Sequence, residues 1–177
     1  MYRSARLALV LGVLAPPTVI AQTDAVRKTE AEVANYRLSM KKLWQIVEVQ
    51  RDLNALLVKD PELFELADQE NEARIKAGKP PTLRERATQL ESRPPIRAVF
   101  AEAGTTPLDW LTATEAMGNA GVSLEIVTGR LDSRSGPPPG TEAEKANVTL
   151  LRQNEAEWRK ILAELERLGD EIANMPE

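Results

Sequence analysis

The C-terminal part of the chain carries a hydrophobic repeat that is typical of one long amphipathic helix. Apolar side chains recur there at spacings of three, four and seven residues, and the members of the repeat are Leu151, Trp158, Ile161, Leu165, Leu168, Ile172 and Met175. These side chains share one narrow helical face, which other helices have to cover. Thr141 and Glu144 have the spacing of a capping box. We therefore predict a single helix from about residue 141 to 175, roughly 50 Å long at 1.5 Å per residue.

Five upstream segments also begin with helix-start signals. Their candidate caps or first helical residues are Ser39, Asp60, Thr82, Pro94 and Thr106. The predicted helices cover residues 39–59, 61–76, 82–92, 94–104 and 106–128. Gly118 and Gly121 weaken the last of these, because glycine costs about 1 kcal/mol relative to alanine inside a helix. We expect a kink or break near Gly118.

These patterns predict an all-α fold, an irregular helical bundle of about five to seven helices with a long C-terminal helix. We find no internal repeat and no alternation of period two, which is the pattern of strands. A chain of 177 residues is long enough for one domain with a substantial core. Residues 22–177 are therefore expected to form a single helical domain.

The composition narrows the chemistry that the chain can support. It contains no cysteine and no histidine, which removes disulfides, thiolate nucleophiles, imidazole bases and the common ligands of zinc and haem. The formal net charge is −4, and basic and acidic residues are interleaved, whereas nucleic-acid binding needs clustered positive charge. We expect no metal, no cofactor, no nucleic-acid partner and no enzymatic activity.

The first 21 residues have the pattern of a secretory signal peptide. Arg3 and Arg6 precede an apolar run over residues 7–15, and Val19-Ile20-Ala21 resembles a cleavage site of small residues. The apolar run is shorter than the roughly 20 residues that a spanning helix needs. We expect an exported protein of the bacterial periplasm, in which residues 1–21 are either a cleaved signal peptide or an uncleaved N-terminal anchor.

Several short motifs resemble those of small, uncharacterised exported helical proteins of Gram-negative bacteria. The motifs are Tyr36-Arg37-Leu38-Ser39, Ala103-Gly104-Thr105-Thr106-Pro107 followed by Trp110, Asn147-Val148, and Asn154-Glu155. The resemblance spans most of the chain after residue 21. It implies export and an all-helical fold, and it implies no activity and no site residues.

Four acidic residues share one face of the helix predicted over residues 61–76, and they are Glu62, Glu65, Asp68 and Glu72. Carboxylates that transfer protons or bind hard cations need burial, close pairing or a calcium-loop pattern, and this run has none of these signals. We interpret it as a solvated face. Asp109 is interpreted as a capping acid rather than a base, and Asn147-Val148-Thr149 as a chance match to the glycosylation pattern.

Three of the few aromatic residues are tryptophans, which anchor both cores and interfaces. Trp158 belongs to the C-terminal repeat and is predicted in the core. Trp44 and Trp110 flank their apolar faces, where a core position and a docking surface are both compatible with the pattern. The loop that contains Pro137, Pro138 and Pro139 is either a polyproline recognition segment or a stiff spacer. Our interface candidates are Trp44, Trp110, Pro137, Pro138 and Pro139.

The sequence favours a protein that acts by contact. We predict a non-enzymatic periplasmic accessory or scaffold subunit that docks on a larger membrane-embedded complex, for instance a photosynthetic or respiratory one. Its partners would be proteins, with membrane contact through residues 1–21 if these are retained. The alternative is a periplasmic small-ligand carrier or a carboxylate-dependent enzyme with a pocket between helices.

Overall fold

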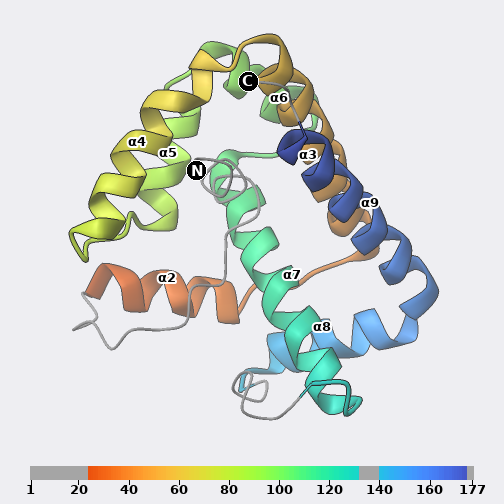
Figure 1. Cartoon of the computed structure of the whole chain (residues 1–177). Helices are drawn as coiled ribbons and strands as arrows, with labels where there is room; N and C mark the ends of the chain where they lie inside the picture. Colours follow the sequence, from red (N-terminus) through yellow and green to blue (C-terminus); the bar gives the residue numbers. More distant parts are fainter. Residues whose placement is uncertain (1–23, 132–139, 175–177) are drawn as a thin grey trace.

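The computed structural model describes residues 24–131 and 140–174, and these residues form eight α-helices and no strand (Figure 1). The helices are α2 (Asp24–Ala34), α3 (Met40–Lys59), α4 (Glu62–Lys76), α5 (Leu83–Glu91), α6 (Pro94–Glu102), α7 (Pro107–Val127), α8 (Glu142–Gln153) and α9 (Glu155–Ala173). The all-α prediction is confirmed. Within the described ranges, no helix combines the length and the apolar character that crossing a bilayer requires.

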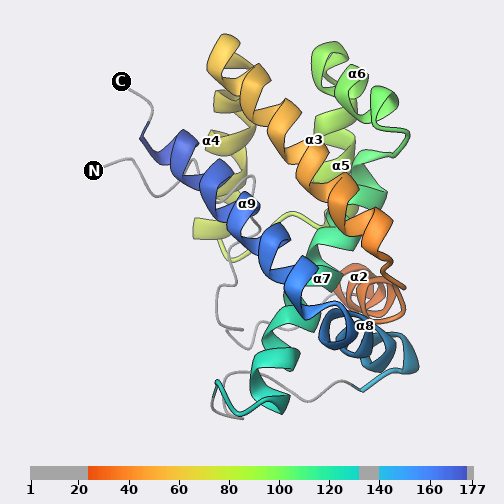
Figure 2. The same cartoon turned by 90° about the vertical axis from the view of Figure 1, so that its right-hand side faces the viewer.

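Helix α7 passes through the middle of the molecule, and most of the other helices pack against it. Helices α5, α8, α2 and α3 all contact α7 (Figure 1). Helix α9 lies along α3 on one side, as the rotated view shows (Figure 2). The core therefore lies around α7 and between α3 and α9.

The local helix signals predict most helix boundaries correctly. Ser39 caps α3 by accepting a hydrogen bond from the Lys42 amide at 3.2 Å, and Thr106 caps α7 by accepting one from Asp109 at 3.1 Å. Full capping boxes start α5 and α8. Asp60 ends α3 as its C-cap, but the prediction that its side chain also caps α4 was wrong, because no side chain caps that helix.

The prediction of one unbroken C-terminal helix was also wrong. The helix breaks at Asn154, whose backbone lies at φ −118° and ψ 35°, and α9 leaves α8 at a large angle (Figure 1). The Asn154 side chain donates a hydrogen bond to the Leu150 carbonyl oxygen at 2.8 Å. Asparagine side chains compete in this way with the helical backbone.

The hydrophobic repeat itself is buried as predicted, although two helices carry it. The buried members are Leu151, Trp158, Ile161, Leu165, Leu168 and Ile172. Met175 lies outside the described residues. Because of the break, α8 packs on α7 while α9 packs on α3, so one sequence repeat serves two different interfaces.

Two further differences follow from tertiary packing. Helix α2 was not predicted, because among its described side chains only Val33 is fully buried and its apolar pattern is weak. With α2, and with α8 and α9 in place of one C-terminal helix, the described residues form eight helices, whereas five to seven were predicted. Helix α7 continues without a break through Gly118 and Gly121. A Cβ atom at Gly121 would lie 3.2 Å from Cζ2 of Trp158, so this glycine allows the indole of α9 to approach α7 closely.

The two glycines of α7 give a matched test of this packing. Gly118→Ala should raise the free energy of unfolding by about 1 kcal/mol, because alanine favours the helix and a Cβ there meets no atom within 4 Å. Gly121→Ala should gain less, because its Cβ crowds Trp158. Denaturant unfolding measures both values.

Trp158→Ala separates the two effects. The substitution alone should cost about 3–5 kcal/mol. In the Trp158→Ala background the crowding disappears, so Gly121→Ala should then stabilise about as much as Gly118→Ala. An equal gain from both glycine substitutions in the wild-type background would contradict the close approach of Trp158.

Candidate functional site

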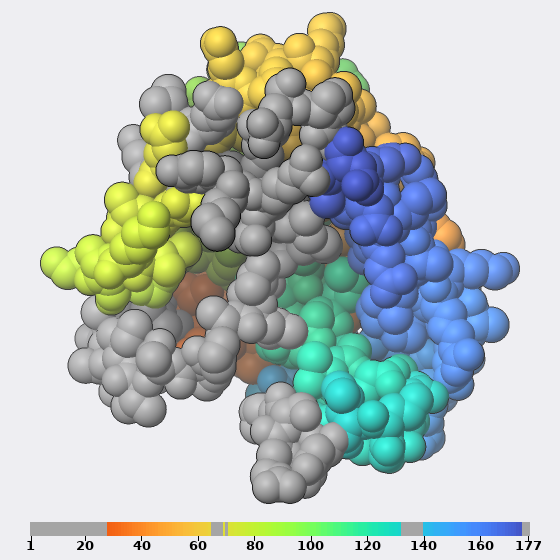
Figure 3. Space-filling model, in the orientation of Figure 1, coloured from red at the N-terminus to blue at the C-terminus, as the bar shows by residue number. Residues whose placement is uncertain are grey.

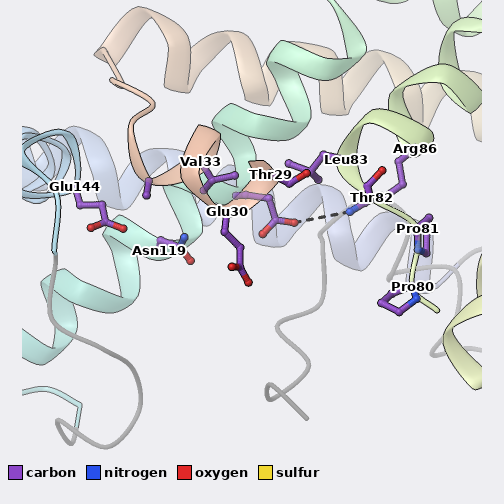
Figure 4. A pocket seen from close by; sticks show the side chains of 12 residues that line it. Thr29, Glu30, Val33, Pro80, Pro81, Thr82, Leu83, Arg86, Asn119 and Glu144 are labelled. Carbon is purple, nitrogen blue, oxygen red and sulfur yellow. Dashed lines mark ion pairs between the residues drawn. The ribbon is translucent and has the colours of Figure 1, made fainter. Parts of the chain in front are cut away.

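A pocket of about 420 Å³ lies where α2, α5, α7 and α8 meet (Figure 4). Its lining residues are Thr29, Glu30, Val33, Ala34, Pro80, Pro81, Thr82, Leu83, Arg86, Glu115, Asn119 and Glu144. In the close-up, Arg86 and the two prolines lie on one side, Asn119 and Glu144 on the other, and Glu30 and Val33 between them (Figure 4). The volume falls in the range of small-molecule sites.

Arg86 and Glu115 form an ion pair in this pocket. Nη1 of Arg86 lies 3.8 Å from Oε1 of Glu115, and the two side chains are 18% and 31% exposed. This distance is too long for a hydrogen bond. Among the described residues, no acceptor takes a hydrogen bond from the Arg86 guanidinium, although it carries five N–H donors. The pair is therefore largely buried, and the guanidinium keeps unused hydrogen-bond donors.

The environment changes the acidity of both groups. Burial raises the pKa of the Glu115 carboxyl above its usual value, and the nearby Arg86 charge offsets only part of this effect. Burial likewise lowers the pKa of Arg86, and the Glu115 charge opposes that shift. Arginine remains protonated in proteins despite such shifts. The pocket thus presents a permanent cation beside a carboxyl group that holds its proton more tightly than an exposed glutamate.

The local sequence explains how the two groups reach the pocket. Pro80 and Pro81 precede the capping box of Thr82, which fixes the start of α5 one turn before Arg86. Leu83 and Ala87 bury the neighbouring face of α5 against the core. On α7, Glu115 stands next to buried Ala116 at the edge of the packed surface.

The other carboxylates of the pocket have partners. Glu144 accepts hydrogen bonds from the Gly140 and Thr141 amides at 2.7 and 2.8 Å as part of its capping box. Glu30 also takes part in an interaction of its own. Arg86 and Glu115 are therefore the charged groups of the pocket with unused capacity for hydrogen bonds to a ligand.

The two tryptophans that the sequence left between core and surface occupy different places. Trp110 is 2% exposed, its Nε1 lies 3.5 Å from the Ile46 carbonyl oxygen, and its ring meets Phe100 edge to face at 5.7 Å. Trp110 is a core residue, so its interpretation as a docking residue does not hold. Trp44 is half-buried, so part of its ring lies at the surface, and its indole N–H donates a hydrogen bond to the Glu157 carboxylate at 2.7 Å. Pro137, Pro138 and Pro139 lie outside the described residues.

The acidic run of α4 does not come together as a site in the part that is described. Glu62 is exposed, and Glu72 pairs with Lys76 at 3.2 Å. The side chains of Glu65 and Asp68 lie outside the described part of the structure. No group of three or more acidic residues that could hold a metal ion occurs among the described residues.

Asn147 has a structural role. Its amide accepts a hydrogen bond from the Leu38 amide at 2.9 Å and donates one to the Tyr36 carbonyl oxygen at 2.8 Å. The residue is buried, so the folded protein does not offer it for glycosylation. It fixes the extended segment that joins α2 to α3.

Asp109 joins three partners rather than acting only as a helix-start acid. Its carboxylate accepts hydrogen bonds from the Tyr36 hydroxyl at 2.7 Å, the Lys42 ammonium at 2.6 Å and the Thr105 hydroxyl at 2.8 Å. Burial acts to raise the pKa of Asp109, but the bonds from Lys42, Tyr36 and Thr105 outweigh it and hold the pKa below the usual value. Burial, followed by the bond to Asp109, raises the pKa of Tyr36. The cluster ties α7 to α3 and to the segment before it.

Asp109 should make stability depend on pH in acid. Its pKa is lowered on folding, so its contribution is complete above the unfolded value of about 4 and is lost as the pH falls through the folded pKa. Asp109→Asn should lower the free energy of unfolding by about 1–2 kcal/mol at pH 7, discounted for partial exposure. It should also flatten the acid dependence. Urea unfolding between pH 2 and pH 7 measures both effects.

Asp52→Asn is the matched control, because Asp52 is an exposed aspartate of α3. This variant should keep the acid dependence of the wild type. An Asp109→Asn variant whose stability falls in acid as steeply as that of the wild type would show that the cluster does not stabilise the fold.

Sequence reasoning missed Arg86 and Glu115. Neither residue belongs to a motif, and each fits the pattern of an ordinary polar helix position. Only the packing of α5 on α7 brings them together.

Comparison of the chain with protein families, with curated proteins and with solved structures finds no match. The resemblance to exported helical proteins stays a prediction.

Proposed function

We propose that the protein is an exported, non-enzymatic carrier that binds a small ligand in the pocket between α2, α5, α7 and α8. The observation that supports this proposal best is the Arg86–Glu115 pair, whose atoms are 3.8 Å apart in a pocket of about 420 Å³. Burying a charged pair with unused hydrogen-bonding capacity costs stability. A ligand that completes those hydrogen bonds recovers part of this cost.

The walls of the pocket fit this role. Val33, Leu83, Pro80 and Pro81 supply apolar surface, and the polar groups stand at defined positions among them. Small-ligand sites combine mostly apolar walls with few polar groups that fix the orientation of the ligand. The sequence pattern of residues 1–21 supports export to the periplasm.

A pocket-filling substitution tests the proposal. Asn119 lies at the exposed rim on α7, so Asn119→Trp should fill the pocket without disturbing the core. Hexanoate, n-hexylammonium and 1-hexanol serve as anionic, cationic and neutral probes. We expect at least one probe to shift the amide resonances of pocket residues in a ¹H–¹⁵N NMR titration, and we expect Asn119→Trp to abolish these shifts.

Ala163→Trp adds the same ring at an exposed position of α9 that does not line the pocket. Binding should survive in this control. If no probe shifts the pocket resonances of the wild type, or if both variants lose binding equally, the carrier proposal fails.

A second candidate function is the accessory or scaffold subunit of a larger membrane complex. It is favoured by surface features that a partner could cover. Val127, the last residue of α7, and Leu131, just beyond the helix, are 57% and 42% exposed. This end of α7 reaches the surface in the space-filling view (Figure 3). Trp44 also keeps part of its ring accessible. Exposed apolar and aromatic groups of this kind occur at protein interfaces.

Fractionation of native membranes tests the subunit role. A docked subunit should stay with the membranes at low salt and co-purify with defined proteins. Val127→Ser combined with Leu131→Ser should release it, whereas Val58→Ser at the exposed end of α3 should not. Intact-mass measurement of the same material shows whether residues 1–21 are removed. A chain found wholly in the soluble fraction without partners would contradict the subunit role.

A further inference from the structure

We propose that the pocket binds a small amphipathic anion, in which one carboxylate, sulfonate or phosphate group lies on the Arg86 guanidinium and a short apolar body lies on the pocket walls. This inference rests on the proposed carrier function and names the class of its ligand. Its physical basis is a difference between the charged groups of the pocket. The Arg86 guanidinium has unused hydrogen-bond donors, whereas the carboxylates of Glu144 and Glu30 already have partners.

Arg86 is the group in the pocket that is best suited to hold a head group. Its planar guanidinium can donate two parallel hydrogen bonds to a carboxylate, sulfonate or phosphate. In the described part of the chain, its one charged partner is Glu115, at a distance that leaves all five N–H donors without a hydrogen bond. Because the side chain is only 18% exposed, water screens its charge weakly.

The carboxylates outnumber Arg86 in the pocket, so a simple count of charges would favour a cation. The contacts reverse this expectation. Glu144 directs its carboxylate to the amides of Gly140 and Thr141, and Glu30 has an interaction of its own. Glu115 is the remaining competitor for the guanidinium. Burial raises its pKa, so it carries its charge less readily than an exposed glutamate and opposes an incoming anion less.

The walls determine the rest of the ligand. Val33 and Ala34 of α2 face the pocket together with Pro80, Pro81 and Leu83 at the start of α5. Covering apolar surface contributes about 25 cal/mol of binding free energy for each Å² that is removed from water. An anion with a short hydrocarbon chain uses both features, whereas acetate uses only the guanidinium.

The test compares probes that differ in charge but share a chain length. Hexanoate and pentane-1-sulfonate should bind more tightly than 1-hexanol and n-hexylammonium in NMR or calorimetric titrations, and more tightly than acetate or inorganic phosphate. Pentane-1-sulfonate stays ionised at every working pH, so it reports on the protein groups alone. Preferential binding of n-hexylammonium, or equal binding of hexanoate and 1-hexanol, would overturn the proposal.

Two substitutions should act in opposite directions. Arg86→Gln should weaken pentane-1-sulfonate binding at least tenfold, because the guanidinium is lost. Glu115→Gln should strengthen it several-fold, because the competing carboxylate becomes neutral. A purely structural role for the pair would not produce this opposition. The matched controls are Arg97→Gln and Glu102→Gln, which change the same charges at exposed positions of α6 and should leave binding unchanged.

The outcomes separate the two proposals. If no probe binds the wild type, the carrier function fails. If probes bind but Arg86→Gln has no effect on the anions, the carrier function stands and the anion assignment fails. Circular dichroism establishes that each variant folds. If Arg86→Gln does not fold, Glu115→Gln decides the question, and unchanged anion binding in that variant overturns the assignment.

Discussion

The fold depends on a central helix that is buried on nearly every side. The buried residues of α7 are Pro107, Trp110, Leu111, Thr112, Ala113, Ala116, Met117, Ala120, Ser123 and Leu124. A helix with apolar residues all round cannot be covered by one partner, so several helices must surround it. Many of these side chains are small, which lets α2, α3, α5 and α8 approach closely. The positions of the remaining helices follow from this requirement.

Burying α7 also brings polar groups into the interior, and most of them are satisfied within the chain. The hydroxyls of Thr112 and Thr114 donate to the Leu108 and Trp110 carbonyl oxygens at 2.7 and 2.8 Å. Buried polar groups are almost always paired in this way, because an unpaired one costs about 1–3 kcal/mol. The Arg86–Glu115 pair differs from these groups, because its 3.8 Å separation leaves both side chains without a hydrogen bond within the described part of the chain.

Local chemistry in the sequence predicts the helix starts well and the long-range packing poorly. Ser39, Thr82, Thr106 and Thr141 cap their helices as predicted, because capping involves residues only a few positions apart. The continuity of α7 depends on tertiary packing, which overrides the helix propensity of its glycines. The break at Asn154 was not predicted, because the hydrophobic repeat continues on both sides of it.

The difference between local signals and long-range packing also explains which candidate residues were placed correctly from the sequence. Trp158 was assigned to the core correctly because its position in the repeat is a local signal. Trp110 flanks its apolar stripe in the sequence, and only the enclosure of α7 decides that it is buried. Arg86 and Glu115 come from helices that are separated in the chain by α6. No spacing rule connects them, so the pocket could not be predicted from the sequence.

Helix α2 links the fold to the proposed binding role. Its described part buries one large apolar side chain, Val33, and polar contacts hold it otherwise. Glu32 pairs with Arg84 of α5, and the Ala34 carbonyl oxygen accepts a hydrogen bond from Thr141. Exposed ion pairs contribute little stability, so α2 belongs to the less stable part of the molecule. Because α2 forms one wall of the pocket, a ligand that contacts α2 and Arg86 together would stabilise this helix in place, and the cost of ordering α2 would in turn limit the affinity of the pocket.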